Sequence, residues 1–149
     1  MTTDPARLEA ALQTAREALL AARNEQGHWT GELSSSALAT ATAVVALQIV
    51  QRETSAKHHH HIKSGLEWLA ANANEDGGWG DSIKSISNIS TTTLCWAAFS
   101  TIPEAGEKHR STVNAAKAWL TQAAGGTEPD QLAPAIVRRY GKDRTFSVP

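Results

Sequence analysis

The chain carries a repeated corner in which a helix-like segment leads to a glycine and, two residues later, a tryptophan. The first copy reads ALLAARNEQGHW over residues 18–29, and the second reads WLAANANEDGGW over residues 68–79. A third segment, WLTQAAGG over residues 119–126, begins in the same way but lacks the final tryptophan. Because one helical hairpin cannot bury its own apolar face, such a repeat predicts stacked helical hairpins.

Apolar residues recur with helical spacing from the start of the chain. The stripe of the first expected helix consists of Leu8, Leu12, Ala15 and Leu19. These positions share one helix face. Asp4 is the expected N-cap, Pro5 suits the first helical position, and the helix should end before Gly27.

Two further helices follow. The second should begin in Ser34–Ser36, whose hydroxyls can cap backbone N–H groups. Its expected buried stripe is Leu38, Val45 and Ile49, with Ala41 and Thr42 between them. The third should run from about residue 56 to 73, and its expected buried face is Ile62, Leu66, Leu69 and Ala73. Gly77 and Gly78 then end the helical pattern.

The second half of the chain predicts three more helices. They should cover about residues 91–101, 104–123 and 131–140, ending before Pro103, at Gly125 and at Gly141 respectively. The isoleucines Ile83, Ile86 and Ile89 stand three apart rather than two, so we interpret residues 83–89 as a loop with apolar anchors. The sequence therefore predicts an all-α protein of about six helices.

Composition restricts the class of protein. The chain has 149 residues, the size of one ordinary domain, and a formal net charge of −1, which argues against nucleic acid as the main partner. Its one cysteine, Cys95, excludes an intrachain disulfide. The N-terminus is too polar for a signal peptide, and the apolar stretch 37–50 is too short and too polar to span a bilayer.

The segment GLEWLAANANEDGGWG, residues 65–80, resembles the repeat shared by squalene-hopene cyclases, oxidosqualene cyclases and other class II terpene cyclases, the prenyltransferase and squalene oxidase repeat. Residues 27–36, 88–94, 115–126 and 138–149 resemble other segments of this family, in its order. The candidate residues of the structural repeat motif are Gly27, Trp29, Gly65, Trp68, Asp76, Gly77, Gly78, Trp79 and Trp119. Where the family repeat has a glutamine that bridges to a neighbouring helix end, this chain has Arg23 and Ala73, so that bridge should be absent or replaced. We expect Trp29 and Trp79 to lie wedged between helices.

The resemblance implies an α/α toroid, in which an inner and an outer ring of helices close on each other. Family members carry two such domains with an apolar cavity between them, and this chain matches the N-terminal, non-catalytic region. We therefore expect residues 1–149 to form a single partial α/α-toroid domain. The chain stops at residues 146–149, where another helix would begin, and we interpret it as a fragment of a longer two-domain protein.

The family's chemistry requires an acid strong enough to protonate an alkene or epoxide. The resemblance assigns that role to an Asp-x-Asp-Asp motif, which this sequence lacks. The nearest carboxylate groups are Glu75-Asp76 and Glu128-Pro129-Asp130, both in turn-like sequence, where we expect solvated or capping side chains. We expect Trp68, Trp79, Trp96 and Trp119 to pack in the core. No catalytic and no cofactor-binding residue is assigned, and no cofactor is expected.

Histidines and the cysteine are the remaining candidates for a metal site. His58 and His61 share a helix face, but no carboxylate or cysteine stands at matching spacing, so we interpret residues 58–61 as a solvated helix start. His28, in a turn, should be exposed. Protein prenyltransferases share the toroid and bind zinc through Asp, Cys and His, but Cys95 has no such partner in register and is expected to be a buried, inert thiol. We assign no metal ligand.

Three functional hypotheses follow. The first is a terpene-cyclase-like scaffold region in isoprenoid or triterpenoid cyclisation, from an isomerase or lyase family but inactive alone. The alternative is a non-enzymatic helical-repeat module that binds protein or lipid through an uncovered apolar face. A carbohydrate-active toroid would need paired carboxylates, and we find no good pair. The expected partners are the remaining domain of a longer cyclase-like chain or a second copy, and an apolar isoprenoid ligand. We expect a cytoplasmic location, or one at the membrane periphery through regions that this sequence lacks.

Overall fold

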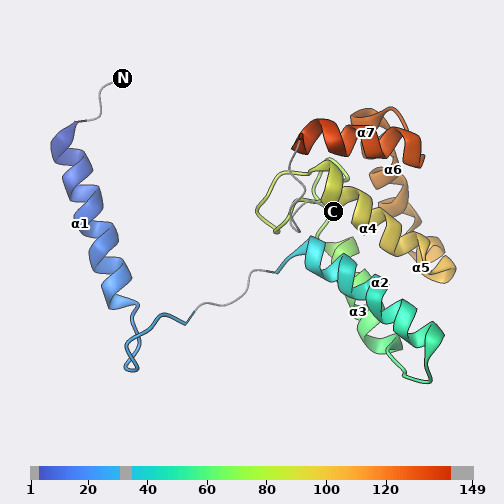
Figure 1. The fold of residues 1–149 in the computed structure, drawn as a ribbon, viewed down its shortest axis with the longest axis horizontal. Coiled ribbons are helices and arrows are strands. Elements are labelled where there is room, and N and C mark those ends of the chain that lie inside the picture. The colour runs from blue at the N-terminus through green and yellow to red at the C-terminus, as the bar shows by residue number, and fades with distance from the viewer. Residues whose placement is uncertain (1–3, 31–34, 142–149) are drawn as a thin grey trace. The chain divides into compact units, whose positions relative to one another are not determined.

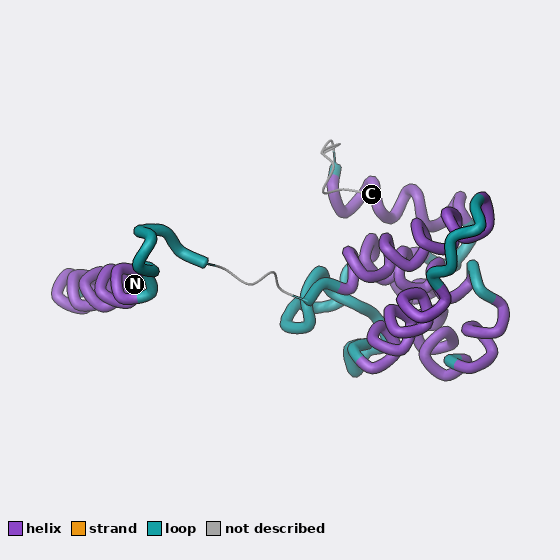
Figure 2. The backbone as a smooth tube through the Cα atoms, turned by 90° about the horizontal axis from the view of Figure 1, so that it is seen from below, coloured by secondary structure: helices purple, strands orange, loops and turns teal. Residues whose placement is uncertain are grey.

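The structure is a computed structural model that describes residues 4–30 and 35–141. In these two ranges every regular element is an α-helix and no strand occurs (Figure 2). The all-α prediction is therefore confirmed. The chain divides into two compact units, residues 1–34 and 35–149, and each is described by itself. The parts of the family-like segments at residues 31–34 and 142–149 lie outside the described residues.

The first unit contains helix α1 (Pro5–Ala21). As predicted, Asp4 is its N-cap, and the Asp4 carboxylate accepts the backbone N–H of Ala6 at 3.0 Å. The predicted leucine stripe lies on one face but is not covered: Leu8 and Leu12 are both 61% exposed and Leu19 is 57% exposed. The sequence pattern thus predicted the helix correctly, while the burial of its apolar face is not seen among the described residues.

The second unit contains α2 (Ala37–Glu53), α3 (His59–Ala71), α4 (Ile89–Ser100), α5 (Pro103–Lys108), α6 (Arg110–Ala124) and α7 (Pro129–Tyr140). Helix α4 contacts each of the other five helices of this unit and lies at its centre (Figure 1). Its buried residues are Ile89, Ser90, Thr91, Thr92, Cys95, Ala98 and Phe99. The apolar residues of α4 lie on several sides of the helix and not in one stripe. A helix that is apolar all round is typical of a protein core, so the composition of α4 is that of a core helix.

The buried face of α2 differs from the prediction. Its buried residues are Ala37, Ala41 and Val44, whereas Leu38 and Val45 are half-buried and Ile49 is 53% exposed. The reason lies in α3. A Cβ atom added at Gly65 would lie 2.6 Å from Cγ2 of Val44, so the two backbones approach closely at this point. Close approach selects the α2 face that carries small side chains, and it turns Ile49 outward.

The expected helix over residues 104–123 consists of two helices, α5 and α6. The backbone leaves the helical conformation at His109, with φ −108° and ψ 32°. The His109 ring packs on Phe99 of α4, with 5.5 Å between ring centroids. Both α5 and α6 contact α4. The sequence stayed helical in pattern across this point, so only packing against α4 reveals the break.

The loop between α3 and α4 was predicted correctly, but its anchors were not. Ile83 and Ile86 are 54% and 87% exposed, and only Ile89, the first residue of α4, is buried. The loop is held by hydrogen bonds instead. The Asn74 side-chain amide donates to the Ser85 carbonyl oxygen at 3.1 Å and to Ser87 Oγ at 2.9 Å.

Candidate functional site

The second glycine–tryptophan corner follows α3 and reverses the chain tightly. The backbone N–H of Asn74 donates to the Gly78 carbonyl at 2.9 Å, and the N–H of Gly77 donates to the Asn74 carbonyl at 2.9 Å. Gly77 has φ +87°, a conformation that residues with a side chain rarely adopt. The turn directs Trp79 back onto the helix that it has just left, where its indole N–H donates to the Leu69 carbonyl at 3.0 Å.

The first corner, fifty positions earlier, has the same backbone hydrogen bonds. Asn24 N–H donates to the His28 carbonyl and Gly27 N–H donates to the Asn24 carbonyl, both at 2.9 Å. Gly27 has φ +84°. The indole N–H of Trp29 donates to the Leu19 carbonyl at 2.6 Å. The repeat seen in the sequence is therefore a repeat of hydrogen-bonded geometry.

The two tryptophans differ in burial. Trp79 is 1% exposed: its backbone N–H donates to Thr92 Oγ1 at 3.0 Å, and its ring lies 6.3 Å from that of Phe99. The prediction that it is wedged between helices is confirmed. Trp29 is 47% exposed on the first unit taken by itself, so wedging between helices is not seen for Trp29 among the described residues. The described part of the first unit has a single helix, and the indole is shielded there on one side by Arg23, whose guanidinium lies 5.9 Å from the ring centroid.

Arg23 stands where the family repeat has glutamine. Its Nε–H donates to the Gly27 carbonyl at 2.7 Å, so it closes its own corner. Ala73, at the corresponding place of the second copy, has no polar side-chain atom. At this corner Asn74 has the polar contacts, as its hydrogen bonds to the following loop show.

Asp76 forms the bridge between neighbouring hairpins that the resemblance left unassigned. Its Oδ1 accepts a hydrogen bond from Ser87 Oγ at 2.6 Å and one from the Gly78 backbone N–H at 3.0 Å. Its Oδ2 accepts the indole N–H of Trp119 on α6 at 3.0 Å. One carboxylate thus ties together the second corner, the loop before α4 and helix α6.

The same hydrogen bonds settle what Asp76 can do chemically. Burial by itself raises the pKa of Asp76, but the hydrogen bonds donated by Ser87, Gly78 and Trp119 outweigh it and hold that pKa below its ordinary value of 3.8. The carboxylate is therefore ionised at neutral pH, and all its partners are donors. Such a group accepts hydrogen bonds well and is a poor proton donor.

The other carboxylates near the turns are solvent-exposed, which is one of the two roles expected for them. Glu75 and Asp130 are exposed, and Glu128 is the N-cap residue of α7. The backbone N–H of Glu128 donates to Oε1 of Gln131 at 3.2 Å, which satisfies one free donor at the helix start.

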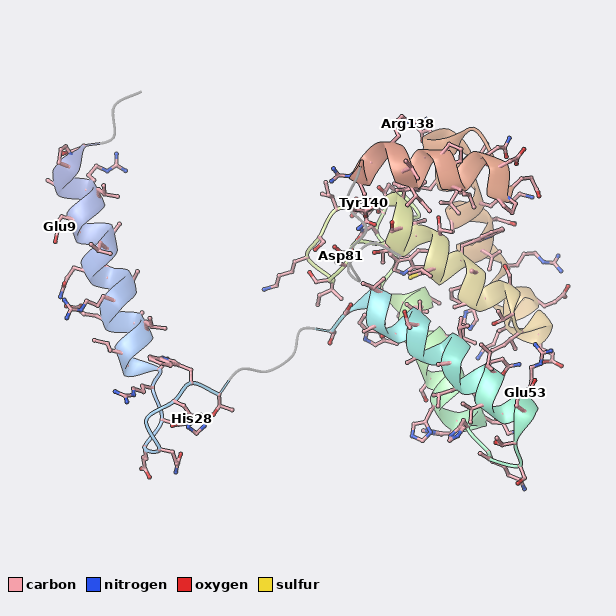
Figure 3. All side chains as sticks on the ribbon, in the orientation of Figure 1. Glu9, His28, Glu53, Asp81, Arg138 and Tyr140 are labelled. Atoms are coloured by element: carbon pink, nitrogen blue, oxygen red, sulfur yellow. The ribbon has the colours of Figure 1, made fainter. Side chains whose placement is uncertain are left out.

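The cysteine and the histidines lie as expected. Cys95 is fully buried, its Sγ lies 3.7 Å from the Ala37 carbonyl oxygen, and burial raises the pKa of its thiol to about 12. His58 precedes α3, residues 59–61 are exposed at its start, and His28 is exposed on the first unit (Figure 3). Across the described residues, no three His, Cys, Asp or Glu side chains gather as a metal site.

The remaining motif residues serve packing. Gly78 allows Ser87 to approach, since a Cβ atom at Gly78 would lie 2.7 Å from the Ser87 side chain. Trp68, Trp96 and Trp119 are half-buried and pack against the two apolar clusters of the second unit. Ser87 and Thr92 were not predicted as partners of the corner, and no local sequence pattern marks them. Asn74 could have been found, because an asparagine precedes the glycine by three in both copies.

Cavities open at several places on the second unit. One of about 530 Å³ lies beside the loop before α4 and is lined by Asp81, Asn88, Trp119 and Arg138, among others. Figure 3 shows Asp81, Tyr140 and Arg138 at this end of the unit. Asp81 is already engaged there, because its Oδ1 accepts the Thr91 hydroxyl at 2.6 Å and the Asn88 side-chain amide at 2.9 Å. A second cavity of about 380 Å³ lies between α2, α3 and α5.

Among the helices that the structure describes, none combines the length and the apolar character that crossing a bilayer requires.

Comparison with known families agrees with the repeated corners. The family model described as the squalene-hopene cyclase N-terminal domain matches residues 12–132, which include both corners, Asp76 and Trp119. No solved structure matches the chain. Because the matched residues make up most of the chain and contain every residue of the repeat motif, the chain belongs to the squalene-hopene cyclase N-terminal domain family.

Proposed function

We propose that this chain is a terpene-cyclase-like scaffold region, of the squalene-hopene cyclase type, that takes part in isoprenoid or triterpenoid cyclisation without supplying the catalytic acid. The family match over residues 12–132 supports this proposal most directly. The sequence contains no Asp-x-Asp-Asp motif, and the carboxylate at its second corner is held ionised by three hydrogen-bond donors.

An alkene is a very weak base, so its protonation needs an acid that is neutral and strongly polarised at the moment of reaction. Asp76 has the opposite environment. We propose that the acid comes from the remaining domain of a longer cyclase-like chain, and that residues 1–149 form one partial α/α-toroid domain beside an apolar isoprenoid ligand.

The test is a reconstitution. The purified 149-residue chain is incubated with squalene or a polyprenyl diphosphate, alone and together with a separately expressed acid-bearing domain of a squalene-hopene cyclase, and products are identified by mass spectrometry. We expect no product from the chain alone and product from the mixture, with the Asp-x-Asp-Asp variant Asn-x-Asn-Asn of the added domain as the inactive control. Product formed by the chain alone would overturn the proposal.

A second candidate is a non-enzymatic binding module. The exposed leucines Leu8, Leu12 and Leu19 on one face of α1 favour it, because apolar stripes of this kind often mark interaction surfaces. Self-association, a protein partner or a lipid could cover them. Light scattering and an apolar-sensitive dye distinguish the two readings: a monomer that binds no dye counts against the module, whereas an oligomer or dye binding that Leu12→Gln abolishes supports it.

We propose a cytoplasmic location, with peripheral membrane contact as the alternative. Flotation of the chain with lipid vesicles tests this point, and recovery in the vesicle fraction would favour the alternative.

A further inference from the structure

The cavity between α2, α3 and α5 has an apolar floor. Its volume of about 380 Å³ lies within the range of small-molecule sites, roughly 300–1,000 Å³. The floor is formed by Ile62 and Leu66 of α3, which are 5% and 3% exposed, with Ile102 and Ala105 at the start of α5. These residues come from segments about forty positions apart, so the cavity exists only in the folded unit.

The rim of the cavity is rich in hydrogen-bond donors. Lys63 lies on it, and no ion pair to Lys63 is found in the described part of the chain. Lys108 also lies on it, and its Nζ is 2.7 Å from Oε1 of Glu67, which is not part of the cavity wall. Glu104 is the carboxylate of the rim. Because Glu67 neutralises Lys108, the charges left on the rim are the ammonium of Lys63 and the carboxylate of Glu104.

Two imidazoles add further N–H donors. Nδ1 of His59 lies 3.1 Å from the Gln51 side-chain nitrogen. Because that nitrogen can only donate, Nδ1 accepts, and Nε2 is the ring nitrogen that carries a proton. For His109, burial first and the neighbouring Lys108 second lower the pKa, while Glu67 raises it, and the net shift is downward. The His109 imidazole is therefore neutral at pH 7 and has one N–H to donate.

We propose that this cavity is a binding site for a carboxylate amphiphile, whose hydrocarbon tail lies on the floor of Ile62, Leu66, Ile102 and Ala105 and whose carboxylate lies at the rim with Lys63. Burial of a hydrocarbon tail supplies affinity in proportion to its area, and an ammonium with N–H donors supplies charge-assisted hydrogen bonds. The N–H groups of Lys63, His59 and His109 outnumber the one carboxylate of the rim, so a headgroup that accepts hydrogen bonds fits there. A single carboxylate meets less repulsion from Glu104 than a diphosphate would. This site is separate from the proposed scaffold role and does not depend on it.

The test uses the full 149-residue chain and sodium octanoate as the probe, followed by amide chemical shifts in nuclear magnetic resonance. 1-Octanol has the same tail without charge, and octylammonium has the opposite charge. We expect the amides of Ile62, Leu66, Ile102 and Ala105 to shift. Octanoate should bind about tenfold more tightly than 1-octanol, the ratio that one charge-assisted hydrogen bond provides. Equal affinity for the two probes, or no shift below the micelle concentration of octanoate, would overturn the proposal.

The proposal predicts opposite effects on octanoate affinity for two charge variants. Lys63→Gln removes the unpaired ammonium and should weaken octanoate binding about three- to tenfold, since the rim is solvent-exposed. Glu104→Gln removes the repelling carboxylate and should tighten binding by a similar factor. Lys117→Gln, on the exposed face of α6, is the matched control and should change nothing. General damage to the fold cannot tighten binding, so the proposal fails if the first two variants shift the affinity in the same direction.

Discussion

Gly77 and Gly125 form a natural pair for separating backbone strain from packing. Both have φ +87°. A Cβ atom added at Gly77 would lie 2.9 Å from Cβ of Ala115 and 3.0 Å from its carbonyl carbon and oxygen on α6, whereas nothing lies within 4 Å of a Cβ atom added at Gly125. Alanine at either position meets the same left-handed strain, but only at Gly77 does it also push against the backbone of a neighbouring helix.

The expected losses differ by the packing contribution. Left-handed backbone costs a residue with a side chain about 1–2 kcal/mol, so Gly125→Ala should lower the free energy of unfolding by that amount. Gly77→Ala should lose about 1–3 kcal/mol more, the usual cost of forcing extra atoms into a packed site. The backbone of α6 cannot give way without displacing Trp119, which holds Asp76 at the corner.

Urea unfolding of the whole chain, followed by circular dichroism, measures both losses, provided that the two variants have the same dependence on denaturant. In a double-mutant cycle, Ala115→Gly should reduce the penalty of Gly77→Ala, because it removes the nearest atom. If Gly77→Ala and Gly125→Ala lose the same free energy, the contact with α6 is not what makes Gly77 necessary, and the reasoning is wrong.

Three further predictions concern the same core. Trp79→Phe should cost about 1–3 kcal/mol of unfolding free energy, because it loses the hydrogen bond to Leu69 and has a smaller ring. Trp29→Phe should cost less, because the Trp29 indole is half exposed. Urea unfolding compares the two variants, and equal losses would contradict the burial argument. Ser90→Ala should leave stability unchanged or raise it by about 1 kcal/mol, because Ser90 Oγ is buried without a partner among the described residues; a loss above about 1 kcal/mol in the thermal or urea transition would argue for a hidden partner. Because the pKa of Asp76 is lowered in the folded state, its contribution to stability is complete above the ordinary pKa of 3.8 and is lost as the pH falls from there through the folded-state pKa. When the free energy of unfolding is measured against pH, Asp76→Asn should lose less stability in acid than the unchanged chain does. Identical pH profiles would exclude this role.

Much of the local structure could be predicted because its causes lie within a few residues. Asp4 caps the second residue after it, and Ser36 caps the third, accepting the Ala39 N–H at 3.2 Å. Gly77 ends its corner through hydrogen bonds to residues no more than three positions away. Membership of the family was predicted from such short motifs for the same reason, and the family match confirms it.

The candidate sites could be predicted only in part. Trp79 was expected as an interior plug, and its indole hydrogen bond reaches only ten positions back, to Leu69. The bridge from Asp76 to Trp119 spans 43 positions, and the sequence pointed to both residues without pairing them. The cavity between α2, α3 and α5 was not predicted at all, since its floor combines Leu66 with Ala105 from a different helix.

By itself, the sequence determined that this chain is helical, where most of its helices end, and that its glycine–tryptophan corners repeat. Tertiary structure alone decided which face of α2 is buried, where the helix breaks at His109, and which carboxylate joins neighbouring hairpins. The physical reason is distance along the chain. Caps and turns draw on neighbours in sequence, whereas the contact of Gly65 with Val44 and that of His109 with Phe99 depend on how closely whole helices can approach.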